Sequence, residues 1–198
     1  MSREITREYP DGLVRCSWPG NDELYVDYHD SEWGVPVVGD RELFERIALE
    51  GFQAGLSWIT ILKRREGFRS AFEGFEIDRV ADFDKAKIEQ LMQDPGIIRN
   101  RAKIEATIHN AGLIRDLQAA GISISELVWQ HSPEPGRRMR PVEGFEWIAT
   151  SPESDRLSKE LRKLGFKFVG STTMFALMQA TGLINDHAPG CFRREQLA

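Results

Sequence analysis

Apolar residues recur at helical spacing along almost the whole chain, and this pattern constrains the fold more than any other feature. The clearest example follows Asp40, where Leu43, Phe44 and Ile47 mark one face of a helix. Further helical patterns cover residues 58–72, 85–92, 99–120, 154–164 and 172–181. Strand-like alternation is visible at residues 166–169, a segment too short to build a sheet. The sequence therefore predicts an all-α fold of about seven or eight helices.

The length of 198 residues suits one domain or two small lobes. Residues 131–144 form a tract rich in proline, glycine and arginine, and we expect it to join parts of a single domain that spans residues 1–198. No apolar run approaches the roughly 20 residues that cross a bilayer, and residues 1–12 lack the apolar centre of a signal peptide. We expect a cytoplasmic protein that does not enter a membrane, and a monomer.

The formal net charge of −5 argues against a protein that coats nucleic acid through bulk positive charge. Acidic residues gather between positions 22 and 32, whereas basic residues cluster at 63–65, 99–103, 137–140 and 162–163. This segregation suits a local binding face, and it also suits ordinary solvated helix surfaces.

The two cysteines lie near opposite ends of the chain, and each has a histidine nearby. The pairs read Cys16-x₁₂-His29 and His187-x₃-Cys191. Two cysteines are too few for a disulfide framework, whereas two thiolates and two imidazoles are a ligand set that zinc takes in closed structural sites. A zinc ion held by all four residues would clasp two chain ends that otherwise fray. The alternative is two buried thiols and two hydrogen-bonded histidines.

Residues 91–104, LMQDPGIIRNRAKI, read as a helix, a tight turn and a second helix, which resembles a helix-hairpin-helix motif. The proline at position 95 ends the first helix, and the glycine at 96 can take a backbone conformation closed to other residues. In such a motif, backbone N–H groups bind a DNA phosphate without needing net positive charge. Within a hairpin spanning about residues 88–110, the expected DNA contacts are Gly96, Ile98, Arg99 and Arg101. Similar turns also occur in helical proteins that bind no DNA.

Aromatic residues concentrate in the first third of the chain. Between positions 18 and 58 lie Trp18, Tyr25, Tyr28, Trp33 and Trp58. Such a cluster can simply be core. Aromatic rings from separate segments can also stack on a base that has been rotated out of DNA, and they attract a positively charged alkylated base.

Glu50 adds a chemical group to this aromatic segment. It follows Leu43 by seven residues and Ile47 by three, so it lies on the apolar stripe of its helix. Gly51 places it in the last turn, where the helix dipole disfavours a carboxylate. Most glutamates are solvated and have no chemical role. A glutamate in this doubly unfavourable position beside an aromatic cluster is a candidate catalytic residue.

Four segments of the chain resemble the DNA-3-methyladenine glycosylase I family, the zinc-containing branch of the helix-hairpin-helix DNA glycosylases. They are RCSWPGNDELYVDYHDSEWGVP, LFERIALEGFQAGLSWITILKRRE, DPGIIRNRAKI and LRKLGFKFVGSTTMFALMQATGLINDHAPGC. The resemblance implies an all-α fold of two helical lobes, with a structural zinc clasp joining segments 16–29 and 187–191. The chain departs from the family pattern at residue 52, which is a phenylalanine where we expect a polar residue. Residues 1–12 and 131–150 also do not match the pattern clearly.

The resemblance also implies site residues. The implied zinc ligands are Cys16, His29, His187 and Cys191. The implied base pocket consists of Trp18, Tyr25, Tyr28, Glu50 and Trp58. A DNA-wedging loop is implied at Gln53, Gly55 and Leu56. We also expect Gln53 to provide a further polar contact to the base.

The residues of the wedging loop themselves also indicate this role. Gly51 and Gly55 bound a short loop that leads into an apolar residue, so we expect Leu56 to fill the gap that a rotated nucleotide leaves. The alternative is a core leucine in a sharp helix connection.

Together, these expectations predict a monofunctional DNA glycosylase of base excision repair. It would hydrolyse the N-glycosidic bond of 3-methyladenine in alkylated double-stranded DNA. N3-methylation makes the base cationic, so it departs as a neutral molecule and needs little acid–base help. The alternative is a non-catalytic DNA-binding or damage-sensing protein, which would have no need of a buried carboxylate. A zinc hydrolase is disfavoured because four protein ligands close the metal to water.

Overall fold

The computed structural model describes residues 4–134 and 138–197. It is mostly helical, with one small antiparallel hairpin in which β1 (Thr6–Glu8) pairs with β2 (Val14–Cys16). Residues 166–169 form no strand. The prediction of a helical fold without a large sheet is therefore confirmed.

The helices are shorter and more numerous than predicted. In chain order they are α1 (Glu23–Ser31), α2 (Asp40–Gln53), α3 (Trp58–Leu62), α4 (Arg65–Ala71), α5 (Ile77–Ala81), α6 (Lys85–Gln93), α7 (Arg101–Ala119), α8 (Ile124–Trp129), α9 (Pro152–Lys163), α10 (Ser171–Ala180) and α11 (Phe192–Gln196), with a 3₁₀ turn at Glu73–Phe75. Eleven α-helices lie within the described residues, several of them with only five to seven residues.

The prediction of a single helix over residues 58–72 is wrong, because the helix is interrupted between α3 and α4. At Arg64 the backbone leaves the helical region, with φ −109° and ψ 3°. The break accompanies an ion pair between Arg65 and Glu32, with Nη1 2.6 Å from Oε2. Periodicity could not show the break because residues on both sides of it, such as Ile61 and Phe68, are buried in the core.

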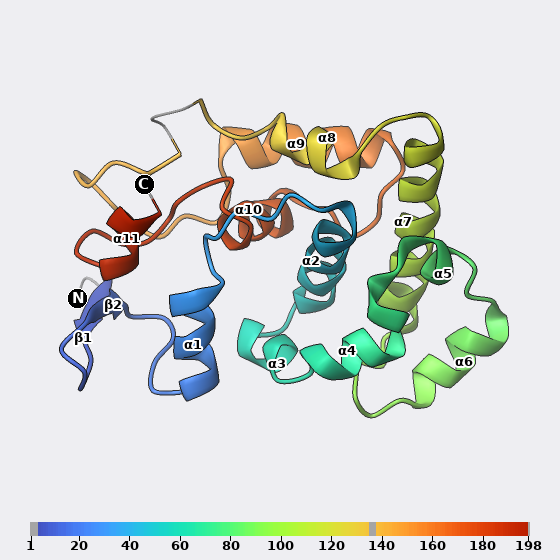
Figure 1. The fold of residues 1–198 in the computed structure, drawn as a ribbon, viewed down its shortest axis with the longest axis horizontal. Helices are drawn as coiled ribbons and strands as arrows, with labels where there is room; N and C mark the ends of the chain where they lie inside the picture. The colour runs from blue at the N-terminus through green and yellow to red at the C-terminus, as the bar shows by residue number, and fades with distance from the viewer. Residues whose placement is uncertain (1–3, 135–137, 198) are drawn as a thin grey trace.

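Helix α2 occupies the centre of the molecule and contacts α3, α7, α8 and α10 (Figure 1). Its buried face carries Leu43, Phe44 and Ile47, as the periodicity predicted. On one side of α2 lie α1, the β-hairpin and α11; on the other lie α4 to α7. Because α11 contacts β2, the two ends of the chain meet on the same side of the molecule.

The proline-rich tract runs back along a segment far away in the sequence. Met139 and Asn185 form a parallel β-bridge, and the Asn185 amide donates to the Arg138 carbonyl oxygen over 2.7 Å. Of the predicted single domain, residues 1–3, 135–137 and 198 lie outside the described residues, and Arg137 of the basic cluster is among them. No helix in the described part of the chain is long and apolar enough to cross a membrane.

Candidate active site and metal centre

Cys16, His29, His187 and Cys191 converge on one point between the chain ends. Their ligand atoms all lie within 4.8 Å of one another, and all four side chains are buried. The Cys191 Sγ atom is 3.5 Å from both His29 Nε2 and His187 Nδ1, and Cys16 Sγ is 3.8 Å from His187 Nδ1. The structure therefore brings together the four residues that the two sequence pairs predicted, close enough to hold one metal ion.

The outer nitrogen of each histidine has a partner of its own. His29 Nδ1 lies 2.7 Å from Asp30 Oδ1, and the Arg15 guanidinium donates to Asp30 over 2.9 Å. His187 Nε2 lies 3.1 Å from the Trp33 carbonyl oxygen. Such outer partners orient the inward ring nitrogen toward a metal and fix its tautomer. The donor set and its surroundings fit a closed tetrahedral site for a soft-ligand metal such as zinc.

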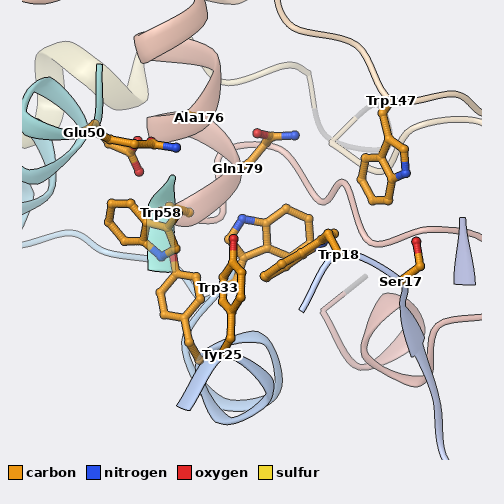
Figure 2. Close-up of a pocket in the computed structure, with 12 residues that line it drawn as sticks. Ser17, Trp18, Tyr25, Trp33, Glu50, Trp58, Trp147, Ala176 and Gln179 are labelled. Carbon is orange, nitrogen blue, oxygen red and sulfur yellow. The ribbon is translucent and has the colours of Figure 1, made fainter. Parts of the chain in front are cut away.

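A cavity of about 460 Å³ opens beside this cluster (Figure 2). Its lining residues are Ser17, Trp18, Tyr25, Tyr28, Trp33, Glu50, Gln53, Trp58, Trp147, Ala176, Gln179 and Ala180. Figure 2 shows Glu50 and Trp58 at one end and Trp147 and Ser17 at the other. The structure thus places all the residues of the predicted base pocket around one space.

The aromatic rings of the cavity contact one another. Trp18 lies 4.8 Å from Tyr25 and 5.1 Å from Trp33, measured between ring centroids, and Tyr28 lies 5.5 Å from Trp58. All of these contacts are tilted or edge-on, not stacked face to face. Such offset and edge-on arrangements are the ones that aromatic pairs prefer.

Glu50 is the one carboxylate of the described cavity lining, and it is 3% exposed. Its Oε2 atom and the Nε1 atom of Trp58 are both buried without a hydrogen-bond partner in the described residues. Burial raises the pKa of Glu50 to about 8, with Arg46 acting in the opposite direction. Unpaired buried polar atoms are costly, and these two atoms are free to form a hydrogen bond with a group that enters the cavity.

The two tyrosines of α1 stay protonated over a wide pH range. Burial, and then the charge of Glu50, raises the pKa of Tyr25 to about 12. The same two causes, in the same order, raise the pKa of Tyr28 further. Neutral hydroxyls can donate hydrogen bonds as well as accept them.

The loop after α2 leaves the body of the protein at the edge of the cavity. Gly55 has φ +82° and has open space beside it, and Leu56 is 41% exposed. The alternative of a core leucine is therefore wrong. Lys103 of α7 supports the loop, since its Nζ donates to the carbonyl oxygens of Phe52 and Ala54 over 2.8 and 2.6 Å.

Residues 94–100 form the predicted turn between α6 and α7. Asp94 Oδ1 accepts a hydrogen bond from the Gly96 amide over 2.7 Å, and Asn100 caps α7 by accepting from the Lys103 amide. The expectation that Gly96 needs an unusual backbone conformation is wrong, because its φ is not positive. The close backbone approach at this turn requires glycine at position 67, where an added Cβ would lie 2.4 Å from the Gly96 carbonyl oxygen; a Cβ on Gly96 itself would lie 3.0 Å from Asp94 Oδ1.

The side chains of the predicted hairpin contacts differ in availability. Arg99 is exposed and lies before α7, whereas the sequence pattern had placed it inside that helix. Ile98 packs partly against the core. Arg101 forms an ion pair with Glu89, with 2.8 Å between Nη2 and Oε2. A ligand at this turn would therefore meet backbone amides and Arg99 more readily than the Arg101 guanidinium.

Comparison with known proteins gives a consistent result. The family model described as methyladenine glycosylase matches residues 18–194. The chain is 48% identical over 179 residues to the DNA-3-methyladenine glycosylase 1 of Escherichia coli (strain K12), an alignment that covers 90% of this chain and 96% of the relative. The chain belongs to the methyladenine glycosylase family.

Solved structures agree with this family membership. A crystal structure of 3-methyladenine DNA glycosylase I superposes with a TM-score of 0.84 at 46% identity, covering 90% of this chain and 98% of that one. A variant of 3-methyladenine DNA glycosylase I in complex with 3-methyladenine superposes with a TM-score of 0.81 at 35% identity, covering 91% and 97% of the two chains. The chain therefore has the fold of these 3-methyladenine DNA glycosylase I structures.

Several residues that line the cavity were absent from the predicted pocket. Trp33 belonged to the aromatic segment but not to the predicted site. Ser17, Trp147, Ala176, Gln179 and Ala180 carry no local signal, because their place in the cavity depends on contacts between distant segments. Phe52, the departure from the family pattern, does not line the cavity. It is buried in the core, 4.6 Å from Phe68 between ring centroids.

Proposed function

We propose that this protein is a monofunctional DNA glycosylase that hydrolyses the N-glycosidic bond of 3-methyladenine in alkylated double-stranded DNA. The observation that carries the proposal is the unpartnered Oε2 of Glu50, buried at one end of an aromatic cavity (Figure 2). The names of its relatives agree with this function.

Glu50 would recognise the base. A carboxylate accepts hydrogen bonds, and the exocyclic amine of 3-methyladenine offers them. Trp58 and Tyr28, whose rings contact each other in the cavity wall, provide stacking surface, and Gln53 provides a further polar contact. The π faces of Trp18 and Tyr25 also favour a cationic base over a neutral one.

Glu50 would also act in the reaction. As the glycosidic bond breaks, positive charge moves from the base onto the sugar, and a negative carboxylate nearby stabilises it. The described cavity lining contains no lysine, hence no amine to attack the sugar and form a covalent intermediate. A water molecule is therefore the nucleophile, and the products are the free base and an abasic site.

Two exposed elements would hold the DNA. In a helix-hairpin-helix fold of two lobes, the backbone amides at Gly96 and at the start of α7 would bind a phosphate, with Ile98, Arg99 and Arg101 beside it. Gly55 and Leu56 would enter the gap left by the rotated nucleotide and offset the loss of stacking. Loop support from Lys103 links these two elements directly.

A zinc ion held by Cys16, His29, His187 and Cys191 would be structural. Four protein ligands leave no open position for water, so the ion would supply folding energy and no chemistry. It would clasp the β-hairpin and α1 to the segment before α11, within a single domain. A monomeric, cytoplasmic protein remains our expectation.

The non-catalytic alternative explains less of the structure. A damage-sensing protein could use the hairpin and the aromatic rings, but a buried glutamate without a partner would only destabilise it. The test is incubation of the protein with methylated duplex DNA and identification of the released bases. We expect 3-methyladenine to be released, and Glu50→Gln to slow its release by a factor on the order of 10–10³, as for loss of one electrostatic contact. Release at the wild-type rate by a folded Glu50→Gln variant would contradict the role of Glu50.

A further inference from the structure

Arg46 lies on α2 one turn before Glu50 and is largely buried, with its side chain 13% exposed. Residues four apart on a helix lie on the same face. The Nη1 atom of Arg46 is buried without a hydrogen-bond partner in the described residues, as is Glu50 Oε2. Two buried atoms of opposite charge are thus left unpaired on one helix face.

The other side of the Arg46 guanidinium is held by Glu32. Arg46 Nη2 donates to Glu32 Oε2 over 2.9 Å, and Arg65 donates to both oxygens of Glu32 over 2.6 and 2.7 Å. The four charged groups therefore alternate in sign in the order Arg65, Glu32, Arg46, Glu50. An alternating row places a positive charge near Glu50 while Glu32 limits its repulsion of a cationic base.

We propose that Arg46 is a positioning residue that favours the charged form of the Glu50 carboxylate, and that Glu32 limits the strength of this effect. The inference rests on the proposed function only for its catalytic consequence. The opposing view is that Arg46 merely joins α2 to α1 through Glu32.

Few other groups could explain a change in the titration of Glu50. Tyr25 and Tyr28 face it from α1, and burial raises the pKa of both above its ordinary value. The residues that α3 and α10 contribute to the cavity, Trp58, Ala176, Gln179 and Ala180, carry no charge. Among the described residues, Arg46 is the one charged group that opposes the effect of burial on the pKa of Glu50.

The test is a carbon-13 NMR titration of the Glu50 carboxyl group, assigned by loss of its signal in Glu50→Gln. Arg46→Met removes the positive charge and should raise the pKa of Glu50 by about one pH unit. Glu32→Gln removes the charge that weakens Arg46 and should lower the pKa of Glu50. Opposite shifts in two variants that break the same ion pair are not expected from a purely structural role. No shift, or shifts in the same direction, would overturn the inference.

Arg69→Met is the matched control. Arg69 pairs with Glu45, the neighbour of Arg46 on α2, over 2.8 Å, and neither residue lines the cavity. We expect the pKa of Glu50 to stay unchanged in this variant. An equal shift there would show that any lost ion pair of α2 has the same effect, and would also overturn the inference.

The pH dependence of base release gives the catalytic readout. When the protein concentration is too low to saturate the DNA, the pH dependence of the rate reports the pKa values of the free protein. The acid limb of this pH profile, where the rate falls as the pH drops, should then move to higher pH in Arg46→Met and to lower pH in Glu32→Gln. At a pH well below the limb, a move of one unit lowers the rate about tenfold. If the wild type releases no base, the proposed function fails while the NMR result still decides the role of Arg46. If the wild type is active and the acid limb of its pH profile is unchanged in both variants, the role of Arg46 is contradicted while the proposed function stands.

Discussion

His187 packs its ring edge-on against Trp33, with 4.5 Å between the ring centroids, and its Nε2 atom lies 3.1 Å from the Trp33 carbonyl oxygen. Trp33 also lines the cavity that contains Glu50. The candidate metal centre and the candidate active site therefore share a wall.

Loss of a metal ligand should affect both sites. We expect Cys191→Ser to lower the free energy of unfolding by about 2–5 kcal/mol, among the larger effects of single substitutions, and to weaken binding of free 3-methyladenine as Trp33 loosens. Calorimetry and quenching of tryptophan fluorescence measure the two effects. Wild-type protein without zinc by elemental analysis, or an unchanged melting temperature in the variant, would contradict the structural zinc.

Glu50 should make the protein less stable as the pH rises. Its pKa of about 8 in the folded protein exceeds its ordinary value of 4.5, so between these pH values the folded state retains a proton that the unfolded state has lost. Stability should then fall by up to about 1.4 kcal/mol per pH unit across this window. Glu50→Gln should melt higher than wild type at pH 8 and similarly at pH 5. The same difference in melting temperature between Glu50→Gln and the wild type at both pH values would show that Glu50 is ionised throughout this pH range.

Leu56→Ala should slow base release from duplex DNA more than from single strands, because only a duplex has a stack to fill. Ile122→Ala is the control, since Ile122 is similarly exposed, at 43% against 41%, and does not line the cavity. Single-turnover rates on both substrates measure the effect. An equal loss on both substrates would rule out a wedge.

Gly96→Val should weaken DNA binding for all sequences, because a side chain would crowd the turn. An added Cβ would already lie 3.0 Å from the Asp94 oxygen that holds the Gly96 amide. Gly112→Val on α7 is the control, since Gly112 has nothing within 4 Å of an added Cβ. Duplex affinity at several salt concentrations measures the effect. If affinity and its salt dependence match the control, the turn has only a structural role.

Lys103→Met should impair duplex substrates more than binding of the free base. The substitution leaves two carbonyl oxygens at the end of α2 without their donor, which costs about 1–3 kcal/mol and frees the loop that carries Leu56. Lys159→Met on the exposed face of α9 is the control. Melting temperature, free-base affinity and duplex release rates separate the effects. Equal losses in the last two would mean that Lys103 supports the whole cavity and not the loop alone.

The sequence by itself determined the features that depend on residue type and local spacing. Helical periodicity predicted the buried face of α2 and the burial of Glu50, because a stripe at helical spacing must face the core. The chemistry of Cys16, His29, His187 and Cys191 predicted one cluster, since few other arrangements use two thiols and two imidazoles at opposite chain ends. A proline and a glycine between two helical patterns predicted the turn at residues 94–100.

Only the tertiary structure decided which of these segments meet. Trp147 and Gln179 reach the cavity from segments far from α1 and α2, and Lys103 reaches the end of α2 across about fifty residues of chain. The row of charges through Glu32 and Arg46 also depends on how three helices pack. Spacing along the chain reports whether a residue is buried, but the partner it is buried against depends on the packing of whole helices, which no local pattern records.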